Sequence, residues 1–165
     1  MMNPAHLHLI VNHFPLISLI LGFLVILSGL ILRSETVKRT AYCIFIFAAA
    51  MALAAFLTGD GAEQAIVNVA GVEENYIHTH EEMAETFAIL CYILGAFSIL
   101  GLWASLQRHA ISSFVVLMCT VFSVLVINFG VKAGTSGGEI RHSEIRQEQL
   151  IPGSTNSDKN ENDRD

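Results

Sequence analysis

The sequence has little charge, little proline and no closely spaced cysteines. Charged residues make up 15% of the 165 positions, three residues are proline, and the three cysteines (43, 91 and 119) each stand alone in an apolar stretch. Without a C-x-x-C or C-x-x-C-H pair, a zinc ribbon, a covalently attached c-type haem and a disulfide scaffold are excluded. We expect the thiols to behave as small apolar side chains.

Motifs for several activities are missing as well. There is no basic run or base-stacking motif for nucleic acid, and no phosphate-binding loop, nucleophile–base pair or paired-carboxylate cleft for hydrolysis or group transfer. The formal net charge of −6 indicates little about partners, because five of the fifteen acidic residues follow Gln147. These absences leave open whether the chain is an enzyme at all.

Apolar residues, in contrast, are abundant enough to require a membrane. They make up 53% of the chain, with a mean hydropathy of +0.54, which is more than a soluble domain of this size can bury. Four runs approach the roughly 20 residues needed to cross a bilayer, at residues 9–32, 41–57, 83–106 and 111–131. We predict an all-α integral membrane protein, a four-helix up-down-up-down bundle, because short connectors join antiparallel neighbours.

Composition also indicates where this domain begins and ends. The first run lacks a basic leader segment and a cleavage site, so we expect it to remain in the mature chain, with Pro15 in the first turn of its helix. The glycine-rich run 134–138 is expected to end the fourth helix and turn the chain back, because glycine permits positive φ. The predicted domain covers residues 1–151, and the polar tail 152–165, which lacks aromatic residues, is expected to be disordered.

Positive charge is distributed unevenly between the connectors. Arg33, Lys38, Arg39 and Arg108 lie in the two short connectors, whereas the long predicted loop 59–80 has four acidic residues and no Lys or Arg. By the positive-inside rule the short connectors face the cytoplasm. We therefore predict a protein of the bacterial inner (plasma) membrane with both termini in the periplasm.

Six of the seven histidines are predicted to share one face of the membrane. An even number of spans separates three groups, which lie at the start of the first span, just before the third span and after the fourth. The six are His6, His8, His13, His78, His80 and His142. Carboxylates lie among them: if the third helix begins near Asn75, His78 and Glu82 occupy one stripe of it.

Three chemistries can use such a face, and the residues alone do not choose between them. Two histidines from different helices can hold haem b within a helix bundle. Imidazoles together with carboxylates can hold non-haem iron, copper or zinc, and histidines beside carboxylates can relay protons. A fourth interpretation is that these groups are merely hydrated at the headgroup level, in a structural membrane subunit without a cofactor.

Short motifs give the chain a resemblance to a group of small, uncharacterised bacterial four-span membrane proteins. They are HLHLIVNHFP at 6–15, TGDGAE at 58–63, HEE at 80–82 and GGEIRH at 137–142. More distantly, the H-F-P and G-G-x-[LI] patterns resemble a broader domain-of-unknown-function family, some members of which are fused to cytochrome c or Rieske-type modules. The resemblance covers about residues 3–146, implies a redox setting and picks out His13, His80 and His142.

We predict that the bundle holds a redox cofactor, haem b, near its outer face and passes electrons to other membrane redox proteins. His13 and His80 are the predicted ligands, His142 is the alternate ligand, and Arg141 is the predicted partner of a haem propionate. For iron, copper or zinc instead, the predicted ligand set is His13, His80, His142, His8 and Glu82. The lipid bilayer is the other expected partner, nucleic acid is not expected, and the oligomeric state stays open.

Overall fold

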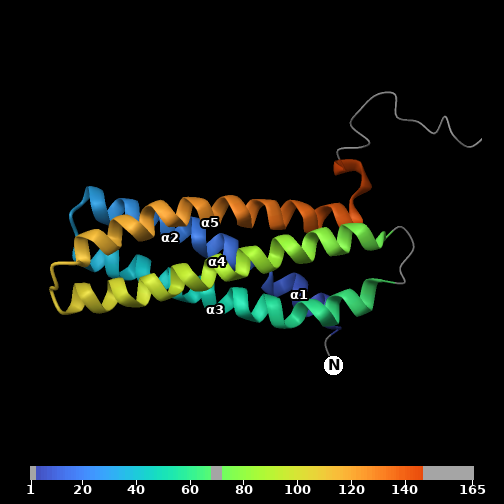
Figure 1. The fold of residues 1–165 in the computed structure, drawn as a ribbon, viewed down its shortest axis with the longest axis horizontal. Helices are drawn as coiled ribbons and strands as arrows, with labels where there is room; N and C mark the ends of the chain where they lie inside the picture. Colours follow the sequence, from blue (N-terminus) through green and yellow to red (C-terminus); the bar gives the residue numbers. More distant parts are fainter. Residues whose placement is uncertain (1–2, 68–71, 147–165) are drawn as a thin grey trace, which may run out of the picture.

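The computed structural model describes residues 3–67 and 72–146, which form helices and connectors without a strand. The elements are α1 (Pro4–Val11), α2 (His13–Ile31), α3 (Glu35–Ile66), α4 (Glu74–Leu106), α5 (Ser112–Arg141) and the short 3-10 helix η1 (Ser143–Ile145). The long helices lie side by side along one axis, and α1 lies against α3 (Figure 1). The predicted all-α four-helix bundle is confirmed, while the predicted tail at 152–165 falls outside the described residues.

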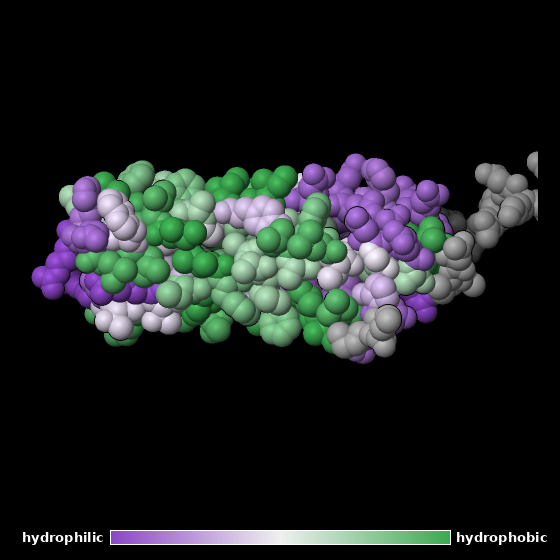
Figure 2. Space-filling model, turned by 90° about the horizontal axis from the view of Figure 1, so that it is seen from below, coloured by the Kyte–Doolittle hydropathy of each residue, from purple (hydrophilic) through white to green (hydrophobic). Residues whose placement is uncertain are grey.

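All four spans predicted from the apolar runs are present. The stretches 4–31, 35–66, 74–106 and 112–141 contain 28 to 33 residues and are each apolar enough to cross a membrane. A helix of about 30 residues is about 45 Å long, longer than the hydrocarbon core of about 30 Å, so its ends extend beyond that core. On the face seen in Figure 2, apolar residues cover the middle and polar residues gather at both ends, as expected in a lipid bilayer.

The helices form a closed ring around an apolar core. α3 packs against α2 and α4, α4 packs against α5, and α5 closes the ring against α2 with a smaller contact. Close approach depends on glycine at Gly22, where an added Cβ would lie 2.6 Å from the ring of Phe45. The largest fully buried apolar side chains are those of Tyr42, Phe45, Leu19, Ile26, Leu94 and Val126.

The first span is broken near its start. α1 ends at Val11 and α2 begins at His13, with Asn12 between them, whereas the apolar run at 9–32 predicts one continuous helix. Pro15 accounts for the break, because it has no N–H and its ring collides with the carbonyl four residues earlier, that of Val11. Pro15 therefore lies in the first turn of α2, as predicted.

Two other expected helix ends are wrong. The segment 59–80 is not a long loop, because α3 runs to Ile66 and α4 begins at Glu74. The glycine-rich run 134–138 does not turn the chain back, because α5 stays helical to Arg141. Glycine costs about 1 kcal/mol per residue inside a helix, but Gly137 makes room for a histidine ring: an added Cβ would lie 3.0 Å from Cε1 of His80.

The chain consists of two similar halves, a first hairpin formed by α1–α3 and a second hairpin formed by α4–α5. Buried positions of α2 recur in α4 at a separation of 72 residues, as in Leu19 and Cys91 or Gly29 and Gly101. Buried positions of α3 recur in α5 at a separation of 78 residues. These pairs are Ala41 and Cys119, Tyr42 and Thr120, Phe45 and Ser123, Ala48 and Val126, and Ala52 and Gly130.

The connectors of the two hairpins match in backbone conformation. Arg33 and Arg108 both have left-handed backbones, with φ of 51° and 53°. In each connector the next N–H reaches a carbonyl five residues earlier, from Ser34 to Gly29 at 3.0 Å and from His109 to Ala104 at 2.8 Å. This is the Schellman cap of a helix C-terminus, and its two occurrences define the connector end of the bundle. The opposite end, where α1 and α4 begin, is called the histidine end below.

Candidate functional site

His8 is held against α3 at the histidine end. It lies on α1 and is half-buried. Its Nδ1 atom lies 3.1 Å from the backbone oxygen of Ala55 and 3.1 Å from Oγ1 of Thr58. The hydroxyl of Thr58 donates to backbone carbonyls of its own helix, which leaves its lone pairs to accept from the imidazole.

His80 makes the same arrangement in the second hairpin. It lies on α4 and is half-buried, and its Nδ1 atom lies 3.0 Å from the backbone oxygen of Ala133 and 3.2 Å from Oγ of Ser136 on α5. Ser136 donates its own hydroxyl proton to Ala133. Each histidine therefore bridges the two arms of its hairpin through one carbonyl and one hydroxyl.

These contacts fix which ring nitrogen carries the proton. A carbonyl oxygen can only accept a hydrogen bond, so Nδ1 must be the donor in both His8 and His80. In a neutral imidazole the lone pair then lies on Nε2. No hydrogen bond from another described residue reaches Nε2 of either ring. Within the described part of the chain, both rings therefore present an unoccupied Nε2 lone pair, the form in which histidine binds metals.

His8 and His80 come from different hairpins and are 72 positions apart in the sequence, yet the charge of His8 acts on His80. They are equivalent residues of the two halves, because the same separation relates the buried positions of α2 and α4. The structure therefore places one imidazole from each half at the histidine end of the bundle.

Polar groups of two further kinds belong to this end. The carboxyl groups of Glu63 on α3 and Glu81 on α4 lie within hydrogen-bond reach of one another, with Asp60 near enough to act on Glu81. Asn12, at the break between α1 and α2, has a buried Oδ1 atom without a hydrogen-bond partner among the described residues. An unpaired buried acceptor is costly, so this atom marks a position that an additional donor would stabilise.

Other predicted site residues do not join the His8–His80 pair. His13 is exposed and its Nδ1 bonds the carbonyl of Leu9 on the preceding turn at 2.9 Å. His142 is exposed and its Nδ1 lies 2.9 Å from Oε1 of Glu144. The pKa of Glu144 is lowered by hydrogen bonds to its carboxylate from the backbone N–H of Glu144 itself and from the side chain of His142. Arg141 is exposed as well.

The predicted carboxylate ligand Glu82 is also exposed, and its Oε1 lies 3.6 Å from Nδ1 of His78 on the same helix. Within residues 3–67 and 72–146, no three His, Cys, Asp or Glu side chains are placed to hold a metal ion. The predicted metal set of His13, His80, His142, His8 and Glu82 is therefore not gathered into one site.

The guanidinium of Arg146 is engaged in contacts that hold two parts of the chain together. It is buried and pairs with Glu73 at the start of α4, donates to the carbonyl of Glu139 at 3.0 Å, and stacks over Tyr76 at 3.9 Å. These contacts tie the chain that follows α5 to the start of α4. They stabilise the second hairpin at the end where His80 lies.

The pairing of His8 with His80 has a signal in the sequence. H-x-H occurs at 6–8 and again at 78–80, and A-x-x-[ST]-G occurs at 55–59 and again at 133–137. The second histidine of each H-x-H bonds the Ala and the Ser or Thr of the A-x-x-[ST]-G in its own hairpin. Recognition of this internal repeat would have singled out His8 in place of His13.

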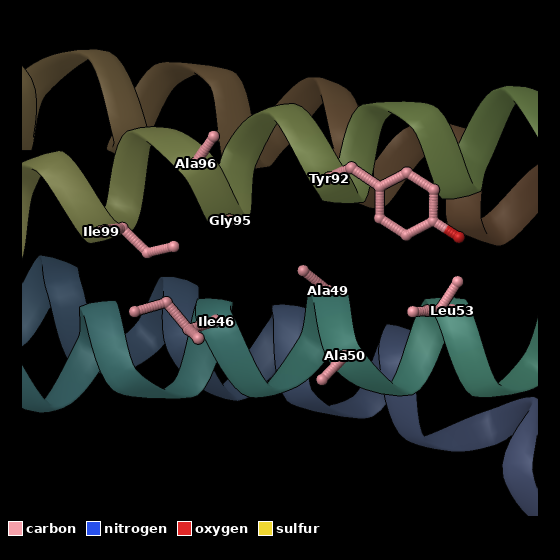
Figure 3. Close-up of a pocket in the computed structure, with 8 residues that line it drawn as sticks. All are labelled: Ile46, Ala49, Ala50, Leu53, Tyr92, Gly95, Ala96 and Ile99. Carbon is pink, nitrogen blue, oxygen red and sulfur yellow. The ribbon is translucent and has the colours of Figure 1, made fainter.

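A groove lies on the outer surface between the middle parts of α3 and α4. It has a volume of about 310 Å³ and is lined by apolar residues and Tyr92. In Figure 3, Tyr92 and Ile99 lean toward α3, and Ala49 and Leu53 lean toward α4. Its lining contains no ionisable group other than the phenol of Tyr92, which suits it to lipid chains and not to metal binding.

Comparison with known proteins does not place the chain in a family. No family model matches it, and neither a curated protein nor a solved structure matches it. The motif resemblance to uncharacterised four-span membrane proteins therefore stays a prediction.

Proposed function

We propose that this membrane protein holds haem b between His8 and His80 and serves in electron transfer. The observation that carries the proposal is the matched pair of imidazoles, one from each hairpin, with Nδ1 donating to a carbonyl and Nε2 free. A hydrogen bond from Nδ1 to a carbonyl orients a ligating histidine and increases its basicity. The proposal keeps His80 from the sequence prediction and replaces His13 with His8.

Two ligands suit haem better than a bare metal ion. Haem brings most of the ligands of its own iron, so His8 and His80 alone would be enough to hold it. Protein sites for zinc use three or four protein ligands, and the described residues offer no group of three. When bound, the haem would supply one-electron redox chemistry.

The chain provides an element that can make room for the macrocycle. Neither the groove between α3 and α4 nor a polar cavity at the connector end is lined by His8 or His80, so neither supplies the space that a haem between these two residues would need. α1 has no buried residue and is joined to α2 through the break at Asn12. We infer that α1 moves outward on binding and carries His8 with it, while His80 stays fixed on the continuous helix α4.

An absorption spectrum of the detergent-purified full-length chain tests this function. Protein produced with ample haem should show a Soret band and the spectrum of six-coordinate low-spin iron. His8→Ala and His80→Ala should each lose that spectrum, whereas His13→Ala and His142→Ala, which change exposed histidines of the same end, should retain it. A colourless wild-type protein, or equal loss in all four variants, would contradict the proposal.

A second candidate function is proton handling at the same end. It is supported by the carboxyl groups of Glu63 on α3 and Glu81 on α4. These two groups lie within hydrogen-bond reach of one another at the histidine end. A pair of carboxyl groups that shares a hydrogen bond can hold and release a proton. If the preparation is colourless and free of iron, copper and zinc, proton flux into liposomes that Glu81→Gln abolishes and Glu82→Gln preserves would favour this function.

We further propose a location in the bacterial inner membrane, with the histidine end in the periplasm and near other membrane redox proteins. The support is the concentration of Arg and Lys in the two connectors, which favours a cytoplasmic connector end. A cysteine placed at Glu74 in a variant lacking Cys43 should then react with a membrane-impermeant maleimide in intact spheroplasts. Reaction only after lysis would reverse the orientation.

A further inference from the structure

A polar cavity lies at the connector end, opposite the histidines and independent of the function proposed for them. It has a volume of about 490 Å³ and is bounded by the start of α3, the end of α4, the second connector and the start of α5. Its charged lining consists of Glu35, Arg39 and Arg108, and its hydroxyl groups come from Ser105, Ser112 and Ser113. On the face shown in Figure 2, the end that contains it has hydrophilic residues among apolar ones.

The one carboxylate of the lining is already paired. Oε1 of Glu35 lies 2.8 Å from Nζ of Lys38, and Oε2 accepts from the hydroxyl of Ser105 at 2.9 Å. Arg39 is held in place by Ser105, because its Nε donates to Oγ at 2.9 Å and its Nη2 to the backbone oxygen at 2.7 Å. Glu35 is therefore hydrogen-bonded to these two partners; the charge of Arg39 acts on it as well, but without a direct ion pair among the described residues.

Positive charge remains available in the cavity. Neither Arg39 nor Arg108 forms an ion pair with a carboxylate in the described part of the chain. Ser112 and Ser113 donate no side-chain hydrogen bond to another described residue, and no side chain caps the first turn of α5. Two guanidinium groups, free hydroxyls and the positive end of a helix dipole together suit an anion with several oxygen atoms.

The position of the cavity along the bundle indicates that the anion is the headgroup of a lipid. Trp103, one turn before the connector, is exposed and stacks on His109 with ring centroids 5.9 Å apart. Exposed tryptophan is typical of the level where hydrocarbon meets headgroups. We propose that this cavity binds the phosphate of an anionic phospholipid, with Arg39 and Arg108 as its cationic ligands and the acyl chains lying along the apolar surface beyond Trp103.

The first connector provides a matched control. Arg33 has the same left-handed backbone conformation as Arg108, with φ of 51° against 53°, and lies at the same end of the bundle. It is exposed and lines neither cavity. Replacement of either arginine by glutamine removes one charge from the same membrane face and imposes the same backbone strain, but only Arg108→Gln changes the cavity.

Native mass spectrometry of the delipidated full-length protein tests the site, with dioleoyl phosphatidylglycerol and dioleoyl phosphatidylcholine as probes. We expect phosphatidylglycerol to bind more tightly, Arg108→Gln to weaken it about fivefold, the effect of one arginine at a membrane surface, and Arg33→Gln to leave it unchanged. Ser113→Asp, which adds a favourable charge to the first turn of α5 but a repulsive one to the cavity, should abolish the preference for phosphatidylglycerol.

The other outcomes are equally definite. Equal binding of the two lipids, or equal loss in Arg33→Gln and Arg108→Gln, would overturn the proposal, because either result shows general surface charge and not a site. Binding of inorganic phosphate that depends on Arg108 and displaces phosphatidylglycerol would support the phosphate site and identify a soluble phosphate as its source.

Discussion

The hairpin of α1–α3 and the hairpin of α4–α5 follow the same backbone plan, yet they fill it with different side chains. α3 places Tyr42 and Phe45 in the core, whereas the equivalent positions of α5 hold Thr120 and Ser123. Both hydroxyls of α5 donate to carbonyls of their own helix at 2.7 Å. Equivalent positions of the two hairpins can therefore be equally buried with side chains of different volume. A large residue of one hairpin packs against a small residue of the other, as Tyr42 packs against Gly101.

At the histidine end the two hairpins have matching side-chain contacts but different backbones. The imidazole, carbonyl and hydroxyl are the same in both hairpins, whereas the backbone differs: the first hairpin is broken at Asn12 and the second is continuous. Preservation of the polar contacts while core volumes diverge indicates that the histidine contacts are the specialised part of each hairpin. The break places one of the two equivalent histidines, His8, on a short helix of its own.

The largest difference between the hairpins should appear in stability. Phe45→Ala removes a fully buried ring, and we expect it to lower the free energy of unfolding by about 2–3 kcal/mol. That is less than the about 3–5 kcal/mol seen in soluble cores, because transfer between helix packing and lipid contributes little. The equivalent change, Ser123→Ala, loses one hydrogen bond to its own helix and should cost less than about 1 kcal/mol.

Chemical denaturation of the two variants in the same detergent measures both values. Similar losses in Phe45→Ala and Ser123→Ala would mean that the hairpins contribute equally to the core, against the asymmetry of their side chains. A loss of cofactor in Phe45→Ala without a loss of stability would likewise contradict a purely structural role.

The fold was predictable because hydrocarbon thickness sets the length of each span. Four apolar runs predict four helices, and the short connectors predict antiparallel neighbours. The continuation of α3 to Ile66 and of α5 to Arg141 was not predictable from run length. Beyond the hydrocarbon, packing between helices decides where a helix ends, and in α5 the glycine-rich run packs against the ring of His80 at Gly137.

The site was predictable only in part. Counting spans places six histidines at one end, but the rotation of each helix decides which of them face inward, and periodicity alone does not fix that rotation. Pro15 breaks the first helix between His8 and His13, so the relative directions of these two side chains are not those of a straight helix. His80 was predicted from the motif resemblance, whereas His8 follows from an internal repeat that becomes plain once both hydrogen-bond patterns are seen.

A glycine in each hairpin provides the next test. An added Cβ at Gly137 would lie 3.0 Å from the ring of His80, whereas at the equivalent Gly59 it would meet nothing within 4 Å. Gly137→Val should therefore displace His80 and weaken cofactor binding about 10- to 100-fold, the usual effect of disturbing the support of a metal ligand. Gly59→Val should bind normally, and valine favours helix over glycine at both positions.

Titration of haem-free Gly137→Val and Gly59→Val with haemin, followed by absorbance, compares their dissociation constants for haemin. Thermal unfolding of both variants serves as the control for folding. Equal affinities would show that His80 tolerates a bulkier neighbour and is not held by this contact, and the rigid support inferred for the second hairpin would then be wrong.

The smallest effect should come from the two hydroxyls that accept from the histidines. Thr58→Val and Ser136→Ala each remove one acceptor of Nδ1 but leave the backbone carbonyl, so the tautomer of each ring is preserved. The loss of one shared hydrogen bond is worth up to about 1 kcal/mol, or a change of at most about fivefold in haemin affinity. If the hairpins are equivalent at the site, the two variants should agree within error and their effects should add in the double variant. A clearly larger effect of Ser136→Ala would mean that the second hairpin holds the cofactor and the arm bearing His8 only closes over it.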